Sequence, residues 1–372
     1  MLSDEQQEIR SLAARFADEV IAPRAGQWDR DHEFPSDVFA QLGELGLMGV
    51  CVPADLGGAG ADFLSYVLVL EELSRGDAGV GVTVAVHTSA CTLPLIANGS
   101  REQVEALVPP LAQGHEIGAF ALTESGSGSD ASAMLTRADD AQRISGTKQW
   151  ITNGSHSHTF LVFAKEGGRD PVPSAFVVRR GAKGFRVTRE EEKMGLNSSS
   201  TADLAFEETP GDRLGERGAG MRIALSTLDG GRIGIAAQAT GIAQAALDAA
   251  VAYAKERRTF GKPIGGHQAI QQKLADMQTN VEAARALTWR AARLKESGRP
   301  HTVEGAQAKL LASRVAREVT GEAIQVLGGY GYTKEFPVER YYRDAKVTEI
   351  YEGTSEIQRL VIARALLGEA AR

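Results

Sequence analysis

The sequence predicts an α+β protein built from three domains: helical over residues 1–117, β-rich over 118–221 and helical again over 222–372. Two observations lead to this prediction. A chain of 372 residues is too long for one ordinary hydrophobic core. In addition, apolar residues at helical spacing give way near Gly118 to short apolar runs broken by glycine, asparagine and proline, and helical spacing returns after Gly220.

The first domain is expected to be a set of helices. Ser3 and Gln6 have the spacing of a capping box, and the helix that they start is expected to end at Pro23. Further helices are expected from Ser36 onward and, after the glycine-rich stretch 56–60, over residues 62–74. The face that the first helix should bury consists of Ile9, Leu12, Phe16 and Val20.

The second and third domains differ in the length of their apolar segments. Short runs at 160–164, 175–178, 185–187 and 204–206 predict strands. Long alanine-rich segments at 226–257, 267–297, 303–326 and 354–367 predict helices. Helices of this length without internal breakers usually pack as a bundle, and often against other subunits.

Composition narrows the class of protein. With 43% hydrophobic and 24% charged residues the chain is of the soluble globular type, and its net charge of -7 argues against a general nucleic-acid binder. The sequence shows no signal peptide and no 18-residue apolar run, so we expect a cytoplasmic protein without a membrane span. The two cysteines, Cys51 and Cys91, lack metal-ligand spacing, and no metal site is expected.

The segment 350–359 carries the best candidate for a catalytic base. Glu352 lies at a junction between a loop and a helix, followed by Gly353, which lets a ligand approach the backbone. Thr354 or Ser355 can cap the helix that follows. The alternative is that Glu352 is only a favourable charge near the positive end of that helix.

Two segments of the middle domain have the residue types of a binding site. Residues 120–130 pass from an apolar run into a Gly/Ser turn, which exposes N–H groups and hydroxyls to an anion or a polar ring edge, unless it is a common loop. The glycine order matches neither the nicotinamide nor the P-loop pattern. Trp150 and Thr152 fall on the same side of a predicted strand, where the indole could be a core anchor or lie against a flat cofactor.

Three segments of the last domain could also meet a ligand. Arg257 follows a long helix and could hold a diphosphate, or be a solvated cation at the helix end. The glycines of 325–332 are either a C-cap or a place where backbone meets ligand. Gly230 and Gly231 weaken a helix beside Asp229 and Arg232, which indicates a close approach there.

Taken together, these segments resemble the acyl-CoA dehydrogenase family over residues 2–367, and 228–235 with 348–363 most resemble its short-chain, butyryl-CoA-type branch. The resemblance implies an N-terminal helical domain, a β-barrel-like middle domain and a C-terminal four-helix bundle. It implies FAD as cofactor, bound across a subunit interface of a homotetramer. It also implies an acyl-CoA substrate, short and linear or methyl-branched, and an electron-transfer flavoprotein as electron acceptor.

The resemblance also assigns roles to residues. Glu352 would remove the α-proton while the flavin accepts the β-hydrogen, giving a trans-2-enoyl-CoA. Flavin contacts within the chain would come from Phe120, Leu122, Thr123, Ser129, Trp150 and Thr152. Contacts from a second subunit would come from Arg257, Thr259, Phe260, Gln268, Gln325, Gly328 and Gly329, and the last flavin contacts from Thr354 and Glu356. Substrate contacts would come from Ser129, Asp229, Arg232, Tyr351 and Gly353, with Asp229 and Arg232 at the CoA end.

Other functions remain as alternatives. An acyl-CoA oxidase would pass its electrons to O2, and a flavin-free scaffold protein on the same fold would be colourless. A decarboxylating dicarboxylyl-CoA dehydrogenase should carry an arginine for the distal carboxylate, but there is none between Arg75 and Arg101. Some relatives carry the base at the position of Gly231, which here supplies no carboxylate.

Overall fold

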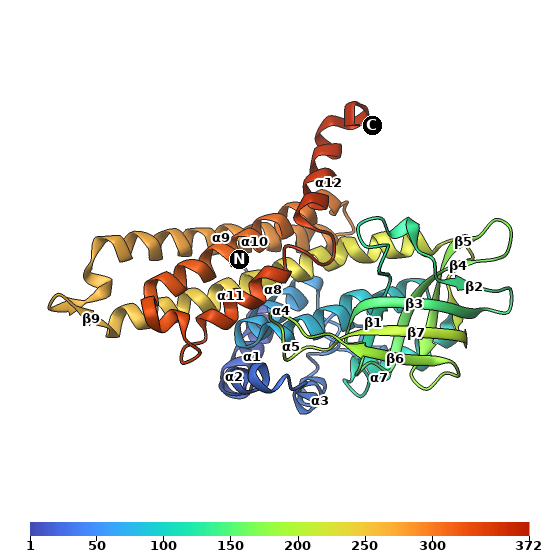
Figure 1. Ribbon diagram of the computed structural model, residues 1–372, viewed down its shortest axis with the longest axis horizontal. Coiled ribbons are helices and arrows are strands. Elements are labelled where there is room, and N and C mark those ends of the chain that lie inside the picture. Colours follow the sequence, from blue (N-terminus) through green and yellow to red (C-terminus); the bar gives the residue numbers. More distant parts are fainter. Residues whose placement is uncertain (372) are drawn as a thin grey trace.

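The computed structural model describes residues 1–371 and orders them as helices, then a sheet, then helices again (Figure 1). The α+β prediction is therefore confirmed. The first strand begins at Gly118, and the long helix that opens the last part begins at Gly220. The sheet lies at one end of the molecule, and the long helices extend from it toward the opposite end (Figure 1).

The N-terminal part contains seven α-helices: α1 (Asp4–Phe16), α2 (Ala22–Asp31), α3 (Ser36–Glu44), α4 (Phe63–Gly76), α5 (Ala78–Ala85), α6 (Leu93–Asn98) and α7 (Arg101–Ala112). The predicted capping box is present, because the Gln6 N–H donates to Ser3 Oγ and the Ser3 N–H to Gln6 Oε1. The prediction that Pro23 ends the first helix is wrong. A π-helical turn over Ala17–Ile21 continues the helix, and Pro23 lies in the first turn of α2, where its missing N–H costs little.

The middle part is one eight-stranded sheet. Its strands are β1 (Gly118–Ala121), β2 (Arg137–Ala138), β3 (Arg143–Thr152), β4 (Thr159–Glu166), β5 (Val172–Arg179), β6 (Phe185–Glu190), β7 (Thr201–Pro210) and β8 (Asp212–Leu214). They follow the order β6-β7-β3-β2-β4-β5-β8, with β1 pairing in parallel with β4. The four predicted strand segments fall in β4, β5, β6 and β7.

Four helices form the C-terminal bundle: α8 (Gly220–Glu256), α9 (Gln268–Glu296), α10 (Thr302–Leu327) and α11 (Val338–Val347). The sequence missed α11. A small hairpin of β9 (Arg258–Thr259) and β10 (Lys262–Pro263) joins α8 to α9 at the end far from the sheet (Figure 1). The last α-helix, α12 (Ser355–Leu367), contacts α10 and projects away from the bundle (Figure 1).

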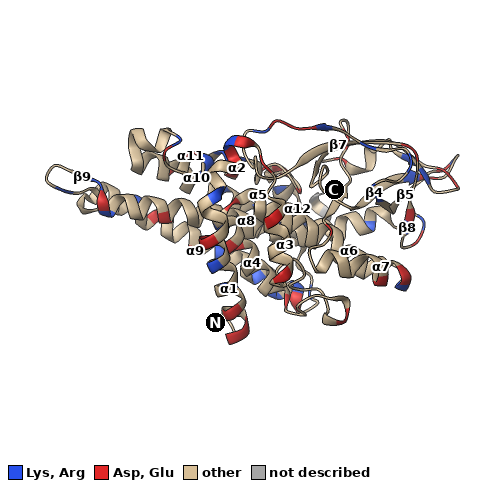
Figure 2. Cartoon of the chain, turned by 90° about the horizontal axis from the view of Figure 1, so that it is seen from below, with Lys and Arg blue, Asp and Glu red and all other residues tan. Residues whose placement is uncertain are grey.

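The hydrophobic core joins the first and last parts of the chain. One cluster of buried side chains runs from α1 and α4 into α8, α9 and α10, so the two predicted helical domains share a core. Helices Ala78–Asn98 and Gly220–Glu256 are long and apolar enough to cross a membrane, but their apolar windows are 83% and 72% buried in this core. In Figure 2, acidic and basic residues lie side by side at the β9 end of the bundle and on α7.

Candidate active site

Glu352 lies in a tight turn between α11 and α12. Its backbone is left-handed, with φ of 49°, and Gly353 follows with φ of 89°. The Ser355 N–H donates to the Glu349 carbonyl (2.9 Å), and Thr354 Oγ1 accepts from the Ile357 N–H (3.3 Å), so the turn is closed and the next helix is capped. A glutamate in this region of backbone space is unusual, and such conformations cluster at functional sites.

The side chain of Glu352 reaches α8 at Gly231. A β-carbon at Gly231 would lie 2.9 Å from Cδ of Glu352 and closer still to its Oε2. Only glycine leaves room for the carboxylate here. The close approach predicted here is therefore made at Gly231 by the predicted base itself, and at Gly230 by the end of the Lys295 side chain.

The surroundings of Glu352 shift the pKa of its carboxyl group to near neutral pH. The residue is half-buried as a whole, but Oε2 is enclosed and has no hydrogen-bond partner in residues 1–371. Burial raises the pKa of Glu352 to about 7, while the positive charges of Lys309 and Arg232 act in the opposite direction. A carboxylate in this state suits proton abstraction at neutral pH.

The backbone around Glu352 is tethered at two points. Tyr351 Oη donates to Gln238 Oε1, and Gln238 Nε2 donates to the Ala78 carbonyl (2.9 Å). The Gly353 carbonyl accepts from Gln358 Nε2 (2.7 Å) and from Lys309 Nζ (2.5 Å). Within the part of the chain that the structure describes, the Glu352 N–H has no acceptor, so this donor remains available to a ligand.

Lys309 was missed at the sequence level, although its spacing carries a signal. It lies four residues after Gly305 and seven before Ala316, on the face of α10 that is buried. A lysine at a core position of a helix rarely stays there unless it is paired. That pattern could have identified it.

Asp229 and Arg232 lie one turn apart on α8 and form an ion pair of 2.6 Å. Thr302 Oγ1 donates to the other oxygen of Asp229 (2.7 Å). Arg232 is buried, and its charge lowers the pKa of Glu352. Arg232 is therefore near enough to Glu352 for its charge to act on that carboxylate, and its role at the CoA end stays a prediction.

The Gly/Ser turn is held by a buried ion pair. Lys148 Nζ contacts Glu124 Oε1 (2.8 Å) and donates to the Leu122 carbonyl (2.9 Å). Glu124 also accepts from the N–H groups of Leu135 (2.6 Å) and Thr136 (3.0 Å). Sequence reasoning had not identified this pair, which fixes both ends of the loop that carries Ser129.

The predicted flavin residues of this region border the turn. Phe120 contacts Phe163 with the two rings tilted by 57° and their centroids 4.9 Å apart, and Leu122 is buried. Thr123 is half-buried, whereas Ser129 is exposed at the tip of the loop. These groups can offer an apolar edge together with a hydroxyl and backbone N–H groups to a ligand.

Trp150 and Thr152 lie at the end of β3, but the strand is irregular there. A register shift separates Lys148 from Ile151, and Trp150 has a positive φ of 58°. The regular alternation that the sequence prediction assumed is therefore interrupted by a bulge. The indole is 55% exposed, so it is not a core anchor in this chain and is open to a flat partner.

A second group of predicted flavin residues lies far from the first. Arg257, Thr259 and Phe260 are at the β9 end of the bundle, with the Arg257 guanidinium 5.9 Å from the Tyr330 ring. Phe260 is 95% exposed. The other members, Gln268, Gln325, Gly328 and Gly329, are also exposed.

Within one chain, the second group also lies far from the base. Gly231, which touches Glu352, and Arg257 are separated along α8 by about 39 Å, at ~1.5 Å per residue. This span is longer than a dinucleotide. Thr354 and Glu356 lie beside Glu352, where Thr354 caps α12 and Glu356 is exposed in its first turn.

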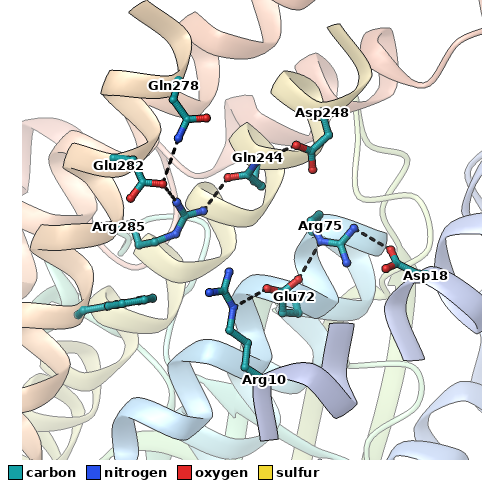
Figure 3. Close-up of a pocket in the computed structure, with 10 residues that line it drawn as sticks. Arg10, Asp18, Glu72, Arg75, Gln244, Asp248, Gln278, Glu282 and Arg285 are labelled. Carbon is teal, nitrogen blue, oxygen red and sulfur yellow. Dashed lines mark hydrogen bonds and ion pairs between the residues drawn. The ribbon is translucent and has the colours of Figure 1, made fainter. Parts of the chain in front are cut away.

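A polar hollow between α1, α4, α8 and α9 is a different feature (Figure 3). Its charged side chains pair with one another: Glu72 with Arg10 and Arg75 (each 2.8 Å), and Arg75 with Asp18 (2.7 Å). None of the predicted site residues lines it. Its ion pairs join α1 to α4. In residues 1–371, no group of three or more His, Cys, Asp or Glu could hold a metal ion.

Comparison with known proteins identifies the family of the chain. Residues 3–115, 119–209 and 218–367 match the N-terminal, middle and C-terminal domains of acyl-CoA dehydrogenase. The chain is 50% identical to the mitochondrial short-chain specific acyl-CoA dehydrogenase of Bos taurus, over 98% of this chain and 91% of that protein. The chain belongs to the acyl-CoA dehydrogenase family.

Solved structures of acyl-CoA dehydrogenase relatives have the same fold. Butyryl-CoA dehydrogenase of Megasphaera elsdenii matches with a TM-score of 0.96, 43% identity and 99% coverage of both chains. A chain solved in work on the electron transferring flavoprotein of Acidaminococcus fermentans matches with a TM-score of 0.97, 46% identity and 99% coverage of both. An acyl-CoA dehydrogenase of Bacillus anthracis, solved with FAD, matches at 0.93 and 34% identity, over 99% of this chain and 68% of that one.

Proposed function

We propose that this acyl-CoA dehydrogenase oxidises short saturated acyl-CoA thioesters, linear or methyl-branched, to trans-2-enoyl-CoA, with Glu352 as the α-proton base. The observation that carries the proposal is the enclosed carboxylate of Glu352 on Gly231, with a pKa raised by burial to about 7. The short-chain and butyryl-CoA descriptions of the relatives support the substrate class.

The residues of the turn can perform the proton step. The Glu352 carboxylate would take the proton from the α-carbon, which acidifies as negative charge develops on the thioester oxygen. The Glu352 N–H, which has no acceptor in the described chain, would donate to that oxygen. The Tyr351–Gln238 contact and the two donors on the Gly353 carbonyl would keep base and N–H in a fixed relation.

FAD is the cofactor that the exposed residues fit. Trp150 offers a ring face, and the Gly/Ser turn offers polar groups. FAD would supply the acceptor for the β-hydrogen. Because Arg257 and its neighbours lie about 39 Å from the base along α8, they would hold the FAD of a second subunit, within a homotetramer.

We also propose an electron-transfer flavoprotein as the acceptor of the electrons. The support is the match to the chain solved in work on the electron transferring flavoprotein of Acidaminococcus fermentans. Rapid reaction of the substrate-reduced protein with O2 would contradict this acceptor and favour an oxidase.

The test of the proposed function is anaerobic mixing of purified holoprotein with butyryl-CoA. Bleaching of the flavin absorbance is expected for the wild-type protein. Glu352→Gln should stay folded and yellow and still bind the ligand, but should not be reduced, because an amide cannot accept the α-proton. Rapid bleaching of Glu352→Gln would show that another group takes the proton, and a colourless wild-type protein would favour a flavin-free scaffold.

A further inference from the structure

Lys309 lies on α10 and is fully buried, and its side chain reaches the turn that carries Glu352. Its ammonium donates to the Gly353 carbonyl (2.5 Å), the carbonyl that also accepts from Gln358 Nε2 (2.7 Å). One donor is charged and the other is neutral. A single neutral donor would satisfy this carbonyl, so the charge of Lys309 calls for a separate explanation.

Of the charged groups around Lys309, Glu352 is the one that can serve as its counter-charge. Four charged groups act on it: Glu352, Arg232, Glu349 and Glu356. Glu349 is engaged by Lys346 (2.6 Å) and Arg317 (3.2 Å), and Arg232 by Asp229 (2.6 Å). Glu356 is exposed beside Arg359.

The charged groups that act on Glu352 are few. They are the cations Lys309 and Arg232, while the phenols of Tyr66 and Tyr351 are affected by its charge. Since Arg232 is shared with Asp229, Lys309 is the cation whose charge is not taken by another carboxylate.

We propose that Lys309 is a positioning residue for the α-proton base: its ammonium holds the Gly353 carbonyl and supplies the positive charge that keeps the Glu352 carboxylate ionised in a dry pocket. This inference rests on the proposed role of Glu352. Lys309 itself need not touch the substrate. It acts through the turn and through the electrostatic potential at the carboxylate.

The titration of the two groups agrees with this arrangement. Burial lowers the pKa of Lys309 to about 8 and raises that of Glu352 to about 7, so both groups are charged between these values. Loss of the lysine charge removes the main influence that keeps the Glu352 carboxylate ionised. The base should then require a higher pH to lose its proton.

The test compares three variants of the holoprotein. Lys309→Gln keeps a donor near the Gly353 carbonyl but removes the charge, Lys309→Met removes both, and Gln358→Leu removes only the neutral donor. The rate of flavin reduction by butyryl-CoA is measured anaerobically from pH 5.5 to 9.5. In both Lys309 variants the midpoint of the pH–rate profile should rise by about one unit, so that reduction at pH 6 is about tenfold slower and recovers at high pH.

Gln358→Leu is the matched control. It should slow reduction by a similar factor at every pH without moving the midpoint. A second readout is independent of turnover: the pH at which the melting-temperature advantage of Glu352→Gln over its parent stops increasing reports the pKa of Glu352 in the folded protein. In the Lys309→Gln background this pH should also rise, and the measurement remains available if Lys309→Met does not fold.

The outcomes separate this inference from the proposed function. If Glu352→Gln is still reduced by butyryl-CoA, the base assignment fails whatever Lys309 does. If Glu352→Gln is inactive but Lys309→Gln has the wild-type midpoint in both readouts, the role of Lys309 is overturned and the base assignment stands.

Discussion

The carboxylate of Glu352 fills the space that any side chain at Gly231 would need. A β-carbon there would come within 2.9 Å of Glu352 Cδ. The two positions lie more than 100 residues apart in the sequence, one on α8 and one in the turn before α12. The fold nevertheless brings them to the same place. A side chain at Gly231 and the Glu352 carboxylate in its present position therefore compete for the same space.

A glutamate at position 231 should be able to replace the base only if the side chain at position 352 is removed. We expect Gly231→Glu to recover part of the activity in a Glu352→Gly background, and not in Glu352→Gln, whose amide would still occupy the space. Glycine suits the left-handed backbone at residue 352. Recovery should stop about 100-fold below wild type, because an ångström-scale misplacement costs about that factor.

Flavin bleaching by butyryl-CoA measures this recovery, with Glu352→Gly alone as the control. Equal rates for Glu352→Gly and the double variant would show that the two positions do not share one site. Recovery in Glu352→Gln carrying Gly231→Glu would show that the amide can move aside.

Glu352→Gln should stabilise the fold above pH 4.5, with the full gain at neutral or higher pH. The pKa of Glu352 is raised from 4.5 to about 7 in the folded protein. Below pH 4.5 both states are protonated, so the variant gains nothing; between 4.5 and 7 the unfolded chain loses its proton first, and the wild type loses stability. Above pH 7 the gain should be about 1 to 3 kcal/mol, at ~1.4 kcal/mol per pKa unit and reduced by the loss of the Lys309 counter-charge.

Thermal melting of both proteins at pH 4.5, 6 and 8, at equal FAD and protein concentrations, measures this difference. A constant difference across this range would mean that Glu352 keeps an ordinary pKa in the folded state.

Arg257→Ala should weaken retention of FAD. Its guanidinium is exposed at the β9 end of the bundle, where a bidentate contact to a diphosphate is geometrically open. Lys255→Ala removes a neighbouring exposed cation and serves as the control. Repeated gel filtration followed by the ratio of flavin to protein absorbance gives the occupancy. Full occupancy in a monomeric species by light scattering would contradict the cross-subunit assignment.

Short acyl chains should react faster than long ones. We expect residues 83–88 to form the floor of the acyl pocket. This segment is buried, and Tyr66 Oη donates to its Ala85 carbonyl (3.2 Å). A tightly packed floor limits depth, although discrimination per methylene is only about 1 kcal/mol, so neighbouring lengths should also react. The kcat/KM values for a C4 to C16 series are the measurement, and a maximum at C16 would overturn the assignment.

The sequence predicted the arrangement of domains because the spacing of apolar residues differs between long helices and short strands. It missed α11, which has only ten residues, five of them charged, so the segment contains few apolar residues. It misplaced the end of the first helix at Pro23, because a π-helical turn over Ala17–Ile21 continues the helix and Pro23 falls in the first turn of α2, where its missing N–H costs little.

At the site, Glu352 was predicted from its loop, whereas Lys309, Gln358 and the Lys148–Glu124 pair were not. Lys309 and Gln358 lie 43 and 6 residues from Glu352 in the sequence, and Lys148 lies 24 residues from Glu124. Only folding brings these groups together. The bulge at Trp150 was also out of reach, since a shift in strand register depends on the partner strand β7.

The distance between Glu352 and Arg257 along α8 has a genetic consequence. If each catalytic centre combines a base from one subunit with an arginine from another, Glu352→Gln and Arg257→Ala damage different halves of the centre. Co-expression of the two impaired variants would then create mixed oligomers in which some centres receive both intact halves. Two alleles that fail separately would complement each other in one cell, and subunits mixed after assembly would not.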